Sequence, residues 1–444
     1  MRSSLVENHN PTAHEHKRAT NHKTVAIMSS IALVIVCGLL FLSLFSPSLP
    51  YTVKQTPTGI DSPHFFNILA ALTGARVQNY EEAQVFTNGE NYYPAEIAAI
   101  RAAQHNINIE AYIFNNGDIA QNVIEALTER SRSGIKVRMI VDSIGSTSPD
   151  DDLYKPLKDA GGRVVAYNRL KWYTWPRMNS RTHREMTIID GKVGFIGGAG
   201  YADHWYEQVK DDPRWRDTMV RVTGAVVTGM QGTFAENWLE SSGEVLTAPD
   251  LFPLANGGPG RPGMVVQSTP TSGGSTEARL LIQMLMASAK SKMLITTPYF
   301  LPDLSIRDEI LNAIKQRHVD VRILVPGKRS DHALTRGSSR RLYGDLLKGG
   351  AHIYEYQPAM IHAKVLVVDG LWSVVGSTNL DSRSFNINDE VNFAAPDPQL
   401  AQRLEQDFWT DLKQSHEINY EEWKHRPMIE RLSESLGSLI QRQQ

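Results

Sequence analysis

The feature of this 444-residue chain that most restricts its fold is an internal duplication. The segment INIEAYIFNNGDIAQNVIEALTERSRSGIKVRMIVD at 107–142 has the pattern strand, helix, strand, and MLITTPYFLPDLSIRDEILNAIKQRHVDVRILVP at 293–326 repeats it. Each unit has an apolar run, an amphipathic helical pattern and a second apolar run, which is typical of a βαβ unit. A Gly-Gly pair follows each unit, at 161–162 and 349–350, where a helix is expected to end and a strand to begin.

The chain is too long for one ordinary domain, and a Gly- and Pro-rich stretch, ANGGPGRPG at 255–263, separates the repeated halves. Hydrophobic residues make up 41% of the chain and charged residues 21%, which provides enough apolar material for buried cores. We therefore predict an α/β protein with a first lobe at 81–255 and a second lobe at 264–444.

The N-terminal part contains a long uncharged run, VAIMSSIALVIVCGLLFLSLF at 25–45. A membrane-spanning helix needs about 20 apolar residues, and the apolar region of a cleaved signal peptide is shorter. The run predicts a retained transmembrane helix at 25–46 after a tail at 1–24. Four basic residues precede the span and only Lys54 follows it closely, so the positive-inside rule predicts a single-pass cell-membrane protein with a cytoplasmic tail and its large domain on the outer side.

Residues 47–80 connect this helix to the first lobe. Their first part is rich in Pro, Ser and Thr, which is typical of a linker, and FFNILAALTGARV at 65–77 has helical periodicity. We expect this helix to dock on the catalytic part. A helix that lies on the membrane surface is the alternative.

Each half also contains a histidine-centred segment: THREMTIIDGKVGFIGGAGYADHW in the first and IHAKVLVVDGLWSVVGSTNLDSRSF in the second. The spacing from His183 to Asp190 equals that from His362 to Asp369. Side chains two residues apart on a strand point the same way, so His362 and Lys364 are expected to share a face. A lysine can hold a non-bridging oxygen of a phosphodiester while an imidazole attacks phosphorus or protonates the leaving oxygen.

These segments resemble the signature of the phospholipase D superfamily, His-x-Lys-x4-Asp followed by a Gly/Ser and Asn segment, present twice. The stretches TTPYFLPD, RTHRE, WRDTMVRVTG and SFNINDEVNF resemble its bacterial cardiolipin synthase-like branch. The likeness runs from about Asn88 to the C-terminus. It implies a duplicated fold of two α/β lobes, each with a mixed sheet flanked by helices, and a pseudo-twofold active site between them.

The resemblance also implies a reaction through a phosphohistidine. One histidine attacks phosphorus, the other protonates the departing alcohol, and a hydroxyl from water or a lipid then takes the phosphatidyl group. By family analogy His183 is the nucleophile and His362 the general acid, with the reverse assignment left open. An acid downstream of each motif is expected to orient its own histidine, Asp217 for His183 and Glu390 for His362. No metal or other cofactor is expected.

Five further motif residues have an expected place in the site. Ser377, Asn379 and Gly198 occupy positions where the resemblance implies substrate contacts, although Ser377 and Asn379 could also serve as turn formers. Asp190 and Asp369 complete the catalytic motif. Because Asp-Gly is also a hairpin signal, we expect these two aspartates to be mainly structural.

The first motif departs from the family pattern at two positions. Glu185 stands where the family has lysine, and Gly200 where it usually has asparagine. An ionised carboxylate beside a phosphodiester would repel it. Three interpretations follow. Glu185 pairs with Arg184 or Arg181, it contacts the substrate through another role such as hydrogen-bonding a polyol, or the protein binds lipid without turnover.

The expected partners are a membrane and a phospholipid, phosphatidylglycerol or a similar lipid, and no obligate protein partner is inferred. The main hypothesis is cardiolipin synthesis from two phosphatidylglycerols or the related phospholipase D hydrolysis. A membrane-anchored nuclease is an alternative, but a net charge of -2 argues against nucleic acid. Aromatic and basic residues interleave at 170–178, which suits a membrane interface, single-stranded nucleic acid or ordinary packing.

Overall fold

The computed structural model describes residues 13–45, 51–54, 59–169, 172, 179–254, 260–270, 276–428 and 431. The chain divides into two units, Met1–Pro50 and Tyr51–Arg442. Half of the predicted tail, most of the aromatic segment at 170–178 and part of the Gly- and Pro-rich stretch lie outside the described residues.

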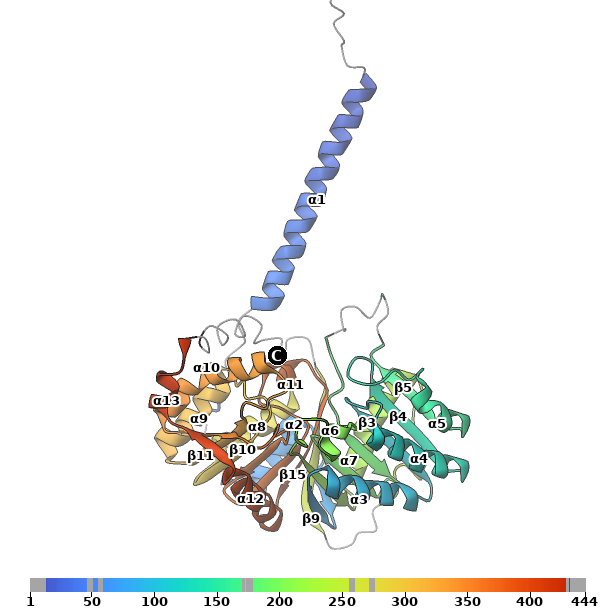
Figure 1. Cartoon of the computed structure of the whole chain (residues 1–444), viewed down its shortest axis with the longest axis vertical. Coiled ribbons are helices and arrows are strands. Elements are labelled where there is room, and N and C mark those ends of the chain that lie inside the picture. The colour runs from blue at the N-terminus through green and yellow to red at the C-terminus, as the bar shows by residue number, and fades with distance from the viewer. Residues whose placement is uncertain are drawn as a thin grey trace, which may run out of the picture. The chain divides into compact units, whose positions relative to one another are not determined.

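The first unit contains one long helix, α1 (Ala13–Phe45), shown in blue in Figure 1. Its window His22–Leu39 has a mean hydropathy of 1.8 and is fully exposed. A helix of 33 residues is about 50 Å long, more than the roughly 30 Å hydrocarbon core of a bilayer. Within the described part of the chain, this is the one helix long and apolar enough to cross a membrane.

The second unit contains the two predicted lobes, each built on a mixed sheet (Figure 1). In the described residues, the strand order of the first sheet is β2 (Ala83–Thr87), β8 (Thr218–Thr223), β7 (Val193–Gly197), β6 (Met186–Ile189), β3 (Asn106–Ala111), β4 (Lys136–Asp142) and β5 (Arg163–Tyr167). Strands β3, β4 and β5 are parallel, while β6, β7, β8 and β2 add to them in antiparallel pairs. The predicted βαβ unit of the first half is therefore confirmed.

The second sheet repeats this order and extends it at both edges. Within the same described ranges its order is β1 (Gln78–Tyr80), β9 (Arg261–Ser268), β15 (Glu390–Pro396), β14 (Trp372–Gly376), β13 (Val365–Val368), β10 (Lys292–Thr296), β11 (Asp320–Pro326), β12 (His352–Tyr356) and β16 (Ser415–Ile418). In sheet order, the strands from β9 through β15, β14, β13, β10 and β11 to β12 correspond one by one to the strands from β2 through β8, β7, β6, β3 and β4 to β5. The duplication in the sequence is thus a duplication of sheet topology.

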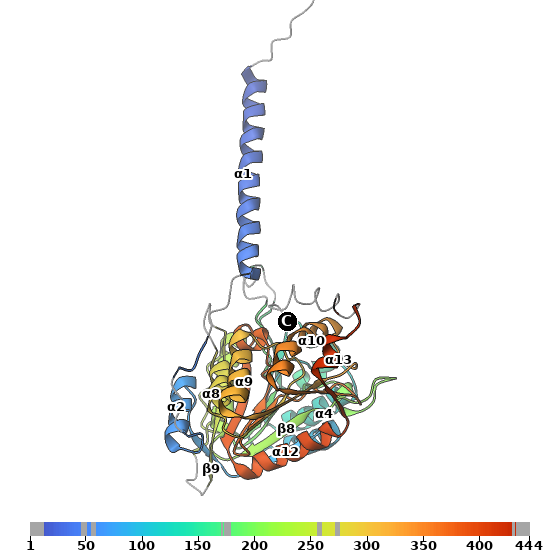
Figure 2. The same cartoon turned by 90° about the vertical axis from the view of Figure 1, so that its left-hand side faces the viewer.

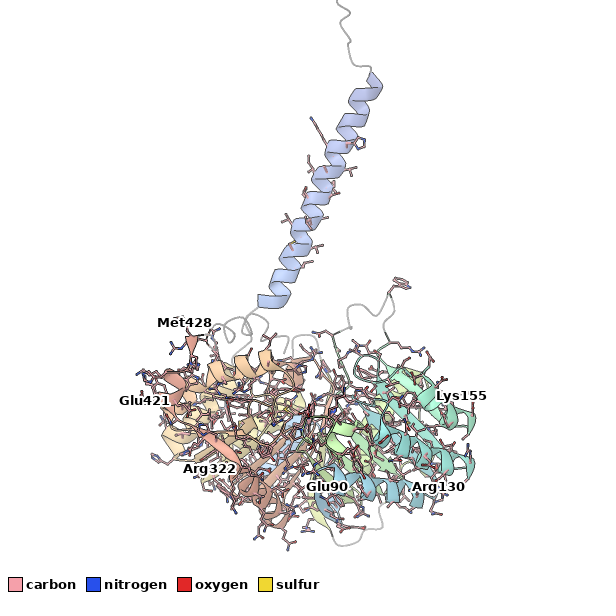
Figure 3. All side chains as sticks on the ribbon, viewed as in Figure 1. Glu90, Arg130, Lys155, Arg322, Glu421 and Met428 are labelled. Carbon is pink, nitrogen blue, oxygen red and sulfur yellow. The ribbon has the colours of Figure 1, made fainter. Side chains whose placement is uncertain are left out.

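Helices pack on both sheets, with the first lobe on the right and the second on the left of Figure 1. The helices of the first half are α2 (Pro63–Thr73), α3 (Gly89–Ala102), α4 (Asp118–Arg132), a 3-10 turn at Asp152–Tyr154, α5 (Lys155–Asp159), α6 (Asp203–Tyr206) and α7 (Val227–Ser242). Those of the second half are α8 (Glu277–Ser288), α9 (Leu304–Arg317), α10 (Ala333–Gly349), α11 (Ser382–Asn386), α12 (Pro398–Leu412) and α13 (Tyr420–Lys424). Charged side chains such as Arg130, Lys155 and Glu421 lie on the outer surface (Figure 3).

The two lobes share one hydrophobic core between their sheets. This core combines Ile188 and Val220 of the first sheet with Val375 and Phe393 of the second, and α7 and α12 contribute to it. Two further cores lie on the outer faces of the sheets, under α3 and α4 in one lobe and under α8 and α9 in the other. Because the shared core removes apolar surface of both lobes from water, it holds their facing edges in fixed positions.

The predicted docking helix is α2, which packs against α8 of the second lobe (Figure 2). Ser62 caps its N-terminus by accepting from the His64 N–H, and Phe65 and Leu69 are fully buried. Trp372 packs edge-on against Phe65, with ring centroids 5.7 Å apart. The segment before the first lobe thus contributes to the core of the second lobe, and strand β1 continues the same connection by pairing with β9.

Candidate active site

Two extended segments carry the histidines, and each pairs with a segment of the other lobe. His183 lies just before β6 and His362 just before β13. The backbone N–H of His183 donates to the Asp389 carbonyl at 2.9 Å, and that of His362 donates to the Arg216 carbonyl at 2.7 Å. Each pairing is a short parallel bridge between lobes. Two such bridges, related by the duplication, form the place where the lobes meet around the histidines.

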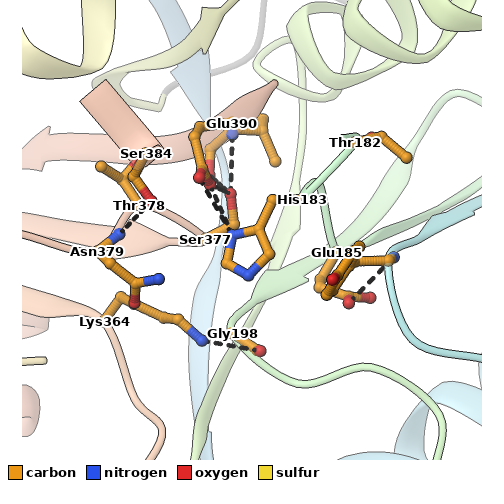
Figure 4. A network of polar contacts seen from close by, with 12 residues as sticks. Thr182, His183, Glu185, Gly198, Lys364, Ser377, Thr378, Asn379, Ser384 and Glu390 are labelled. Atoms are coloured by element: carbon orange, nitrogen blue, oxygen red, sulfur yellow. Dashed lines mark hydrogen bonds and ion pairs between the residues drawn. The ribbon is translucent and has the colours of Figure 1, made fainter. Parts of the chain in front are cut away.

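The bridges determine which acid holds which histidine. Glu390 lies 3.0 and 3.1 Å from Nδ1 of His183 through its two carboxylate oxygens, as Figure 4 shows. Asp217 Oδ2 lies 2.9 Å from Nδ1 of His362. The prediction that Asp217 orients His183 and Glu390 orients His362 is therefore wrong. In each bridge, the residue whose carbonyl accepts from the histidine N–H directly precedes an acid of the opposite lobe. Each histidine is therefore held by the acid of the other lobe and not by that of its own lobe.

Glu390 and Asp217 are both fully buried, and each has a second hydrogen-bond donor. The Ser377 hydroxyl, for which a substrate contact is predicted, donates to Glu390 Oε2 and fixes the carboxylate behind His183 (Figure 4). Asp217 accepts from Trp205 Nε1 at 3.1 Å and from the Thr218 N–H at 2.7 Å. These neighbours fix both carboxylates and, through them, both imidazole rings.

The electrostatics around Asp217 favour its ionised form. Burial acts to raise the pKa of this carboxyl, but the hydrogen bond and charge of His362, together with Lys364, hold it below its usual value. Burial and the nearby Lys364 lower the pKa of His362, while Asp217 opposes that change. The free site therefore favours a neutral His362 beside an ionised Asp217 at neutral pH.

Lys364 lies beside His362, as strand alternation predicts. Its Nζ is 2.9 Å from Nδ1 and 3.1 Å from Nε2 of His362, and it donates to the Gly198 carbonyl of the first lobe at 3.2 Å (Figure 4). Burial lowers the pKa of Lys364, while Asp217, Glu390 and nearby carboxyls oppose that change. The ammonium group thus lies at the lobe junction, where a phosphodiester oxygen could replace its contact with the imidazole.

The arginine partners proposed for Glu185 are wrong. Arg181 pairs with Asp142 at 3.3 Å and Arg184 with Glu236 at 2.9 Å. Adjacent side chains of an extended segment point to opposite sides, so Arg184 faces away from Glu185. Glu185 Oε1 instead accepts from two backbone N–H groups at the end of β3, those of Tyr112 at 3.1 Å and Ile113 at 3.2 Å. Burial raises the pKa of Glu185 well above its usual value.

Glycines line the first-lobe side of the site because the backbone approaches closely there. A Cβ at Gly198 would lie 2.8 Å from Lys364 Cδ and 2.9 Å from Asp217 Oδ1. A Cβ at Gly200 would lie 2.5 Å from the Ile113 carbonyl oxygen and 3.0 Å from Glu185 Oε1. A side chain at residue 200 would therefore crowd both the end of β3 and the Glu185 carboxyl.

Asn379 and the two motif aspartates contact backbone groups and Ser384 and are not hydrogen-bonded to either histidine in the described residues. The Asn379 N–H donates to Ser384 Oγ at 3.1 Å, and among the described residues its buried side-chain Oδ1 has no hydrogen-bond partner. Asp190 and Asp369 lie in left-handed turns at the far ends of β6 and β13, with φ of 54° and 55°. Each accepts several backbone N–H bonds from the segment that precedes β3 or β10. These contacts give both aspartates the structural role expected of Asp-Gly turns.

Several aromatic residues around the histidines were missed by the sequence reasoning. The Tyr112 ring lies 5.3 Å from His183, and Trp205, Trp215 and Tyr299 lie 5.3, 5.5 and 6.3 Å from His362. Three of them follow a strand end or a motif: Tyr112 after β3, Tyr299 after β10 and Trp205 at the end of the first motif. That shared position is the signal that could have identified them.

Among the described residues, no group of three or more histidine, cysteine or acidic side chains could hold a metal ion.

A family model described as "Cardiolipin synthase, PLD-like domain" matches residues 97–211 and 281–412. The chain belongs to this family. The matched ranges contain both histidine motifs and Glu390, while Asp217 lies six residues after the end of the first range.

Relatives within the cardiolipin synthase family match most of the chain. A cardiolipin synthase of Geobacillus kaustophilus is 31% identical over 402 residues, which cover 89% of this chain and 79% of that protein. The major cardiolipin synthase ClsA of Bacillus subtilis is 35% identical over 361 residues, covering 80% and 74%. The family prediction made from the motifs is confirmed.

A solved structure supports the fold assignment. The crystal structure of phosphatidylserine synthase from Haemophilus influenzae superposes with a TM-score of 0.66, covering 86% of this chain and all of that one. At 13% identity this likeness concerns the fold alone. Together with the repeated strand order, it confirms the predicted duplicated phospholipase D-like architecture.

Proposed function

We propose that this protein transfers a phosphatidyl group between lipids, joining two phosphatidylglycerol molecules into cardiolipin and releasing glycerol. The observation that carries the proposal is the pair of buried histidines, each held at Nδ1 by a carboxylate of the opposite lobe, in a chain of the cardiolipin synthase family. Both relatives described above are cardiolipin synthases. The substrates are therefore a phospholipid donor and a phospholipid acceptor at a membrane.

In the first step, Nε2 of His183 attacks the donor phosphorus. A phosphorus–nitrogen bond forms, the bond from phosphorus to the glycerol headgroup oxygen breaks, and His362 gives its proton to that oxygen. Glu390 orients His183 through Nδ1, which leaves the Nε2 lone pair for attack. Lys364 leaves His362 to hold a non-bridging oxygen, where it offsets the charge that develops in the transition state.

In the second step, a headgroup hydroxyl of another phosphatidylglycerol attacks the phosphohistidine. His362 takes the hydroxyl proton, the new phosphorus–oxygen bond forms and the phosphorus–nitrogen bond breaks, which restores His183. Asp217 stabilises the imidazolium form of His362 at each stage. With water as acceptor, the same step yields phosphatidic acid.

The lowered pKa of His362 in the free site has a consequence for this assignment. A general acid must carry a proton, and burial with Lys364 disfavours that proton. A bound phosphodiester brings a negative charge next to both groups and draws Lys364 away, which favours the protonated imidazole. Donor binding should therefore be accompanied by proton uptake at neutral pH.

A conversion assay tests the proposed reaction. The detergent-solubilised full chain is incubated with phosphatidylglycerol and a chelator, beside His362→Ala, and cardiolipin, phosphatidic acid and glycerol are measured. We expect cardiolipin and glycerol from the parent and a loss of at least about 1,000-fold in His362→Ala. A parent that binds the lipid without product, or that cleaves an oligonucleotide instead, would refute the proposal.

Phosphoenzyme trapped by denaturation at alkaline pH, where the phosphorus–nitrogen bond survives, tests the roles of the histidines. With labelled donor lipid, we expect the phosphoryl group on His183, and its accumulation should increase in His362→Ala supplied with a donor whose leaving group needs no proton. Phosphate mapped to His362 would reverse the assignment.

We also propose that α1 is a single membrane span, with the tail in the cytoplasm and the catalytic unit on the outer side. The basic residues before the span support this orientation. Cys37 is the only cysteine of the chain, so a Cys37→Ser, Glu129→Cys protein carries one thiol, on the catalytic unit. A membrane-impermeant thiol reagent should label it in intact spheroplasts, whereas labelling only after lysis would place the catalytic unit inside.

A further inference from the structure

Glu185 is the residue in the site that the proposed chemistry leaves unexplained. It occupies the position of Lys364 in the first motif, two residues after His183, and only 3% of it is exposed. Its Oε1 accepts from the Tyr112 and Ile113 N–H groups, whereas Oε2 is buried without a hydrogen-bond partner among the described residues. A buried carboxyl with one bonded and one isolated oxygen favours the neutral acid. Within the described part of the chain, an ionised oxygen at the isolated position would have neither a hydrogen-bond donor nor a cation in contact to stabilise its charge.

The contacts of Glu185 lead directly to His183. The two N–H groups that donate to Glu185 lie at the end of strand β3. The ring of Tyr112 packs edge-on against His183, with centroids 5.3 Å apart. Gly200 leaves the room that this arrangement needs, since a Cβ there would lie 3.0 Å from Glu185 Oε1. Glu185 therefore connects the end of β3, the Tyr112 ring and the glycine segment on one side of the nucleophile.

We propose that Glu185 is a positioning residue that works uncharged: it fixes the end of β3 and the Tyr112 ring beside His183, and it leaves charge compensation of the phosphodiester to Lys364. This inference rests on the proposed phosphatidyl transfer. It makes the two halves of the site unequal, because a lysine ammonium lies 2.9 Å from His362 Nδ1, while the equivalent position of the first motif holds Glu185. A histidine without an adjacent cation is the better nucleophile of the two.

The groups that face Glu185 come from several elements. Lys364 favours its ionised form, as do the two backbone N–H groups, while Asp217 disfavours it. Tyr93, Tyr112 and Tyr201 are also close enough to sense its charge. Burial outweighs the favourable contacts, so the pKa of Glu185 is raised. Deprotonation at high pH would place an anion beside the phosphodiester, so the rate should fall as pH rises.

Three substitutions separate the possible roles of Glu185 in the full-length protein with phosphatidylglycerol as substrate. Glu185→Gln keeps the shape, the acceptor oxygen and the neutral state, so its kcat should stay within about threefold of the parent. Glu185→Ala leaves two partly buried N–H groups without their acceptor, so kcat should fall about 10- to 100-fold with KM little changed. Glu185→Lys introduces the family residue against those donors and should not exceed the parent. Glu82→Gln, an exposed acid paired with Arg221, is the matched control and should behave as the parent.

The pH profile distinguishes this role from a merely structural one. The parent should lose activity at high pH in a step that Glu185→Gln lacks and Glu82→Gln retains. A glutamine variant as poor as the alanine variant would show that the ionised carboxylate is needed and overturn the proposal. A lysine variant more active than the parent would overturn it too, because it would mean that the first motif has lost a catalytic lysine.

Two measurements that do not depend on turnover keep this inference separate from the proposed function. Infrared spectroscopy should show a protonated buried carboxylic acid in the parent at neutral pH whose band is lost in Glu185→Gln. Hydrogen exchange should show the Tyr112 and Ile113 amides protected in the parent and in Glu185→Gln but not in Glu185→Ala. If the parent makes no cardiolipin while both results hold, the proposed function fails but the neutral positioning role stands. If the infrared band is missing, the inference fails whether or not the protein turns over.

Discussion

Glu110 offers a quantitative test of how the site is held together. It lies on β3 and is fully buried, and its Oε1 accepts from the Thr182 hydroxyl at 2.6 Å and from Asn237 Nδ2 at 2.6 Å. Asn237 Nδ2 also donates to Asp389 at 3.0 Å, the residue whose carbonyl holds the His183 backbone. Burial raises the pKa of Glu110 to about 7, against the opposing charge of Arg184.

The pKa determines both the sign and the size of the effect on stability. Between pH 4.5 and about 7 the folded protein keeps a proton on Glu110 that the unfolded chain releases. The contribution of Glu110 to the free energy of unfolding is therefore most favourable below pH 4.5 and is lost as pH rises to about 7. Each pH unit corresponds to about 1.4 kcal/mol, so the rise from 4.5 to about 7 costs about 3 kcal/mol at higher pH. Glu110→Gln keeps an acceptor oxygen for both donors and removes this titration.

Denaturant titration of the detergent-solubilised protein at pH 5 and pH 8 measures the effect. The stability of Glu110→Gln relative to the parent should increase by about 3 kcal/mol between the two pH values. Glu129→Gln, an exposed acid on α4, is the matched control and should show no such increase. If the difference between Glu110→Gln and the parent is the same at both pH values, Glu110 is ionised in the folded protein and the reasoning is refuted.

Three further substitutions test other contacts of the structure. Asp217→Asn should lower the pKa of His362, followed by NMR titration, and reduce kcat about 1,000- to 10,000-fold, because the amide no longer stabilises the imidazolium. Gly200→Ala should cost about 1–3 kcal/mol of stability in denaturant titration, since its Cβ would lie 2.5 Å from the Ile113 carbonyl oxygen. Trp372→Ala should cost about 3–5 kcal/mol and release α2, seen as faster amide exchange along that helix.

Local patterns predicted the α/β class and the repeated βαβ units, whereas the mixed sheets and the site between the lobes were predicted from the family resemblance. The alternation of apolar runs and amphipathic helices predicts β3, α4 and β4 as well as β10, α9 and β11, because each element is determined mainly by its own periodicity. The equal spacing of the two motifs also predicts His183 and His362 at equivalent places. Their strands repeat in the same order in both sheets, so the repeat in the sequence corresponds to a repeat in sheet topology.

The pairing of histidines with acids was not accessible from sequence order. Asp217 follows His183 by 34 residues and Glu390 follows His362 by 28, which suggested a partner within each lobe. The structure instead joins residues 207 and 145 positions apart, because each histidine segment forms its backbone bridge with the other lobe. Such a bridge depends on how two folded lobes meet, and no local pattern encodes it.

The partner of Glu185 was missed for a different reason. A search among side chains for a charge to neutralise the glutamate considers only Arg181 and Arg184, which are engaged by Asp142 and Glu236. The structure satisfies it with backbone N–H groups, which every residue carries and which therefore leave no sequence signal. The one visible sign was the second departure from the family pattern, Gly200.

The exchange of acids also explains why the two lobes must act as one catalytic unit. His183 without the second lobe would lose Glu390, and His362 without the first would lose Asp217. The Gly198 carbonyl of the first lobe likewise accepts from Lys364 of the second. Because each lobe supplies a histidine and the carboxylate for the opposite histidine, a change in the angle between the lobes would disturb both imidazoles together. The shared core between the sheets therefore determines the catalytic geometry as well as the stability of the fold.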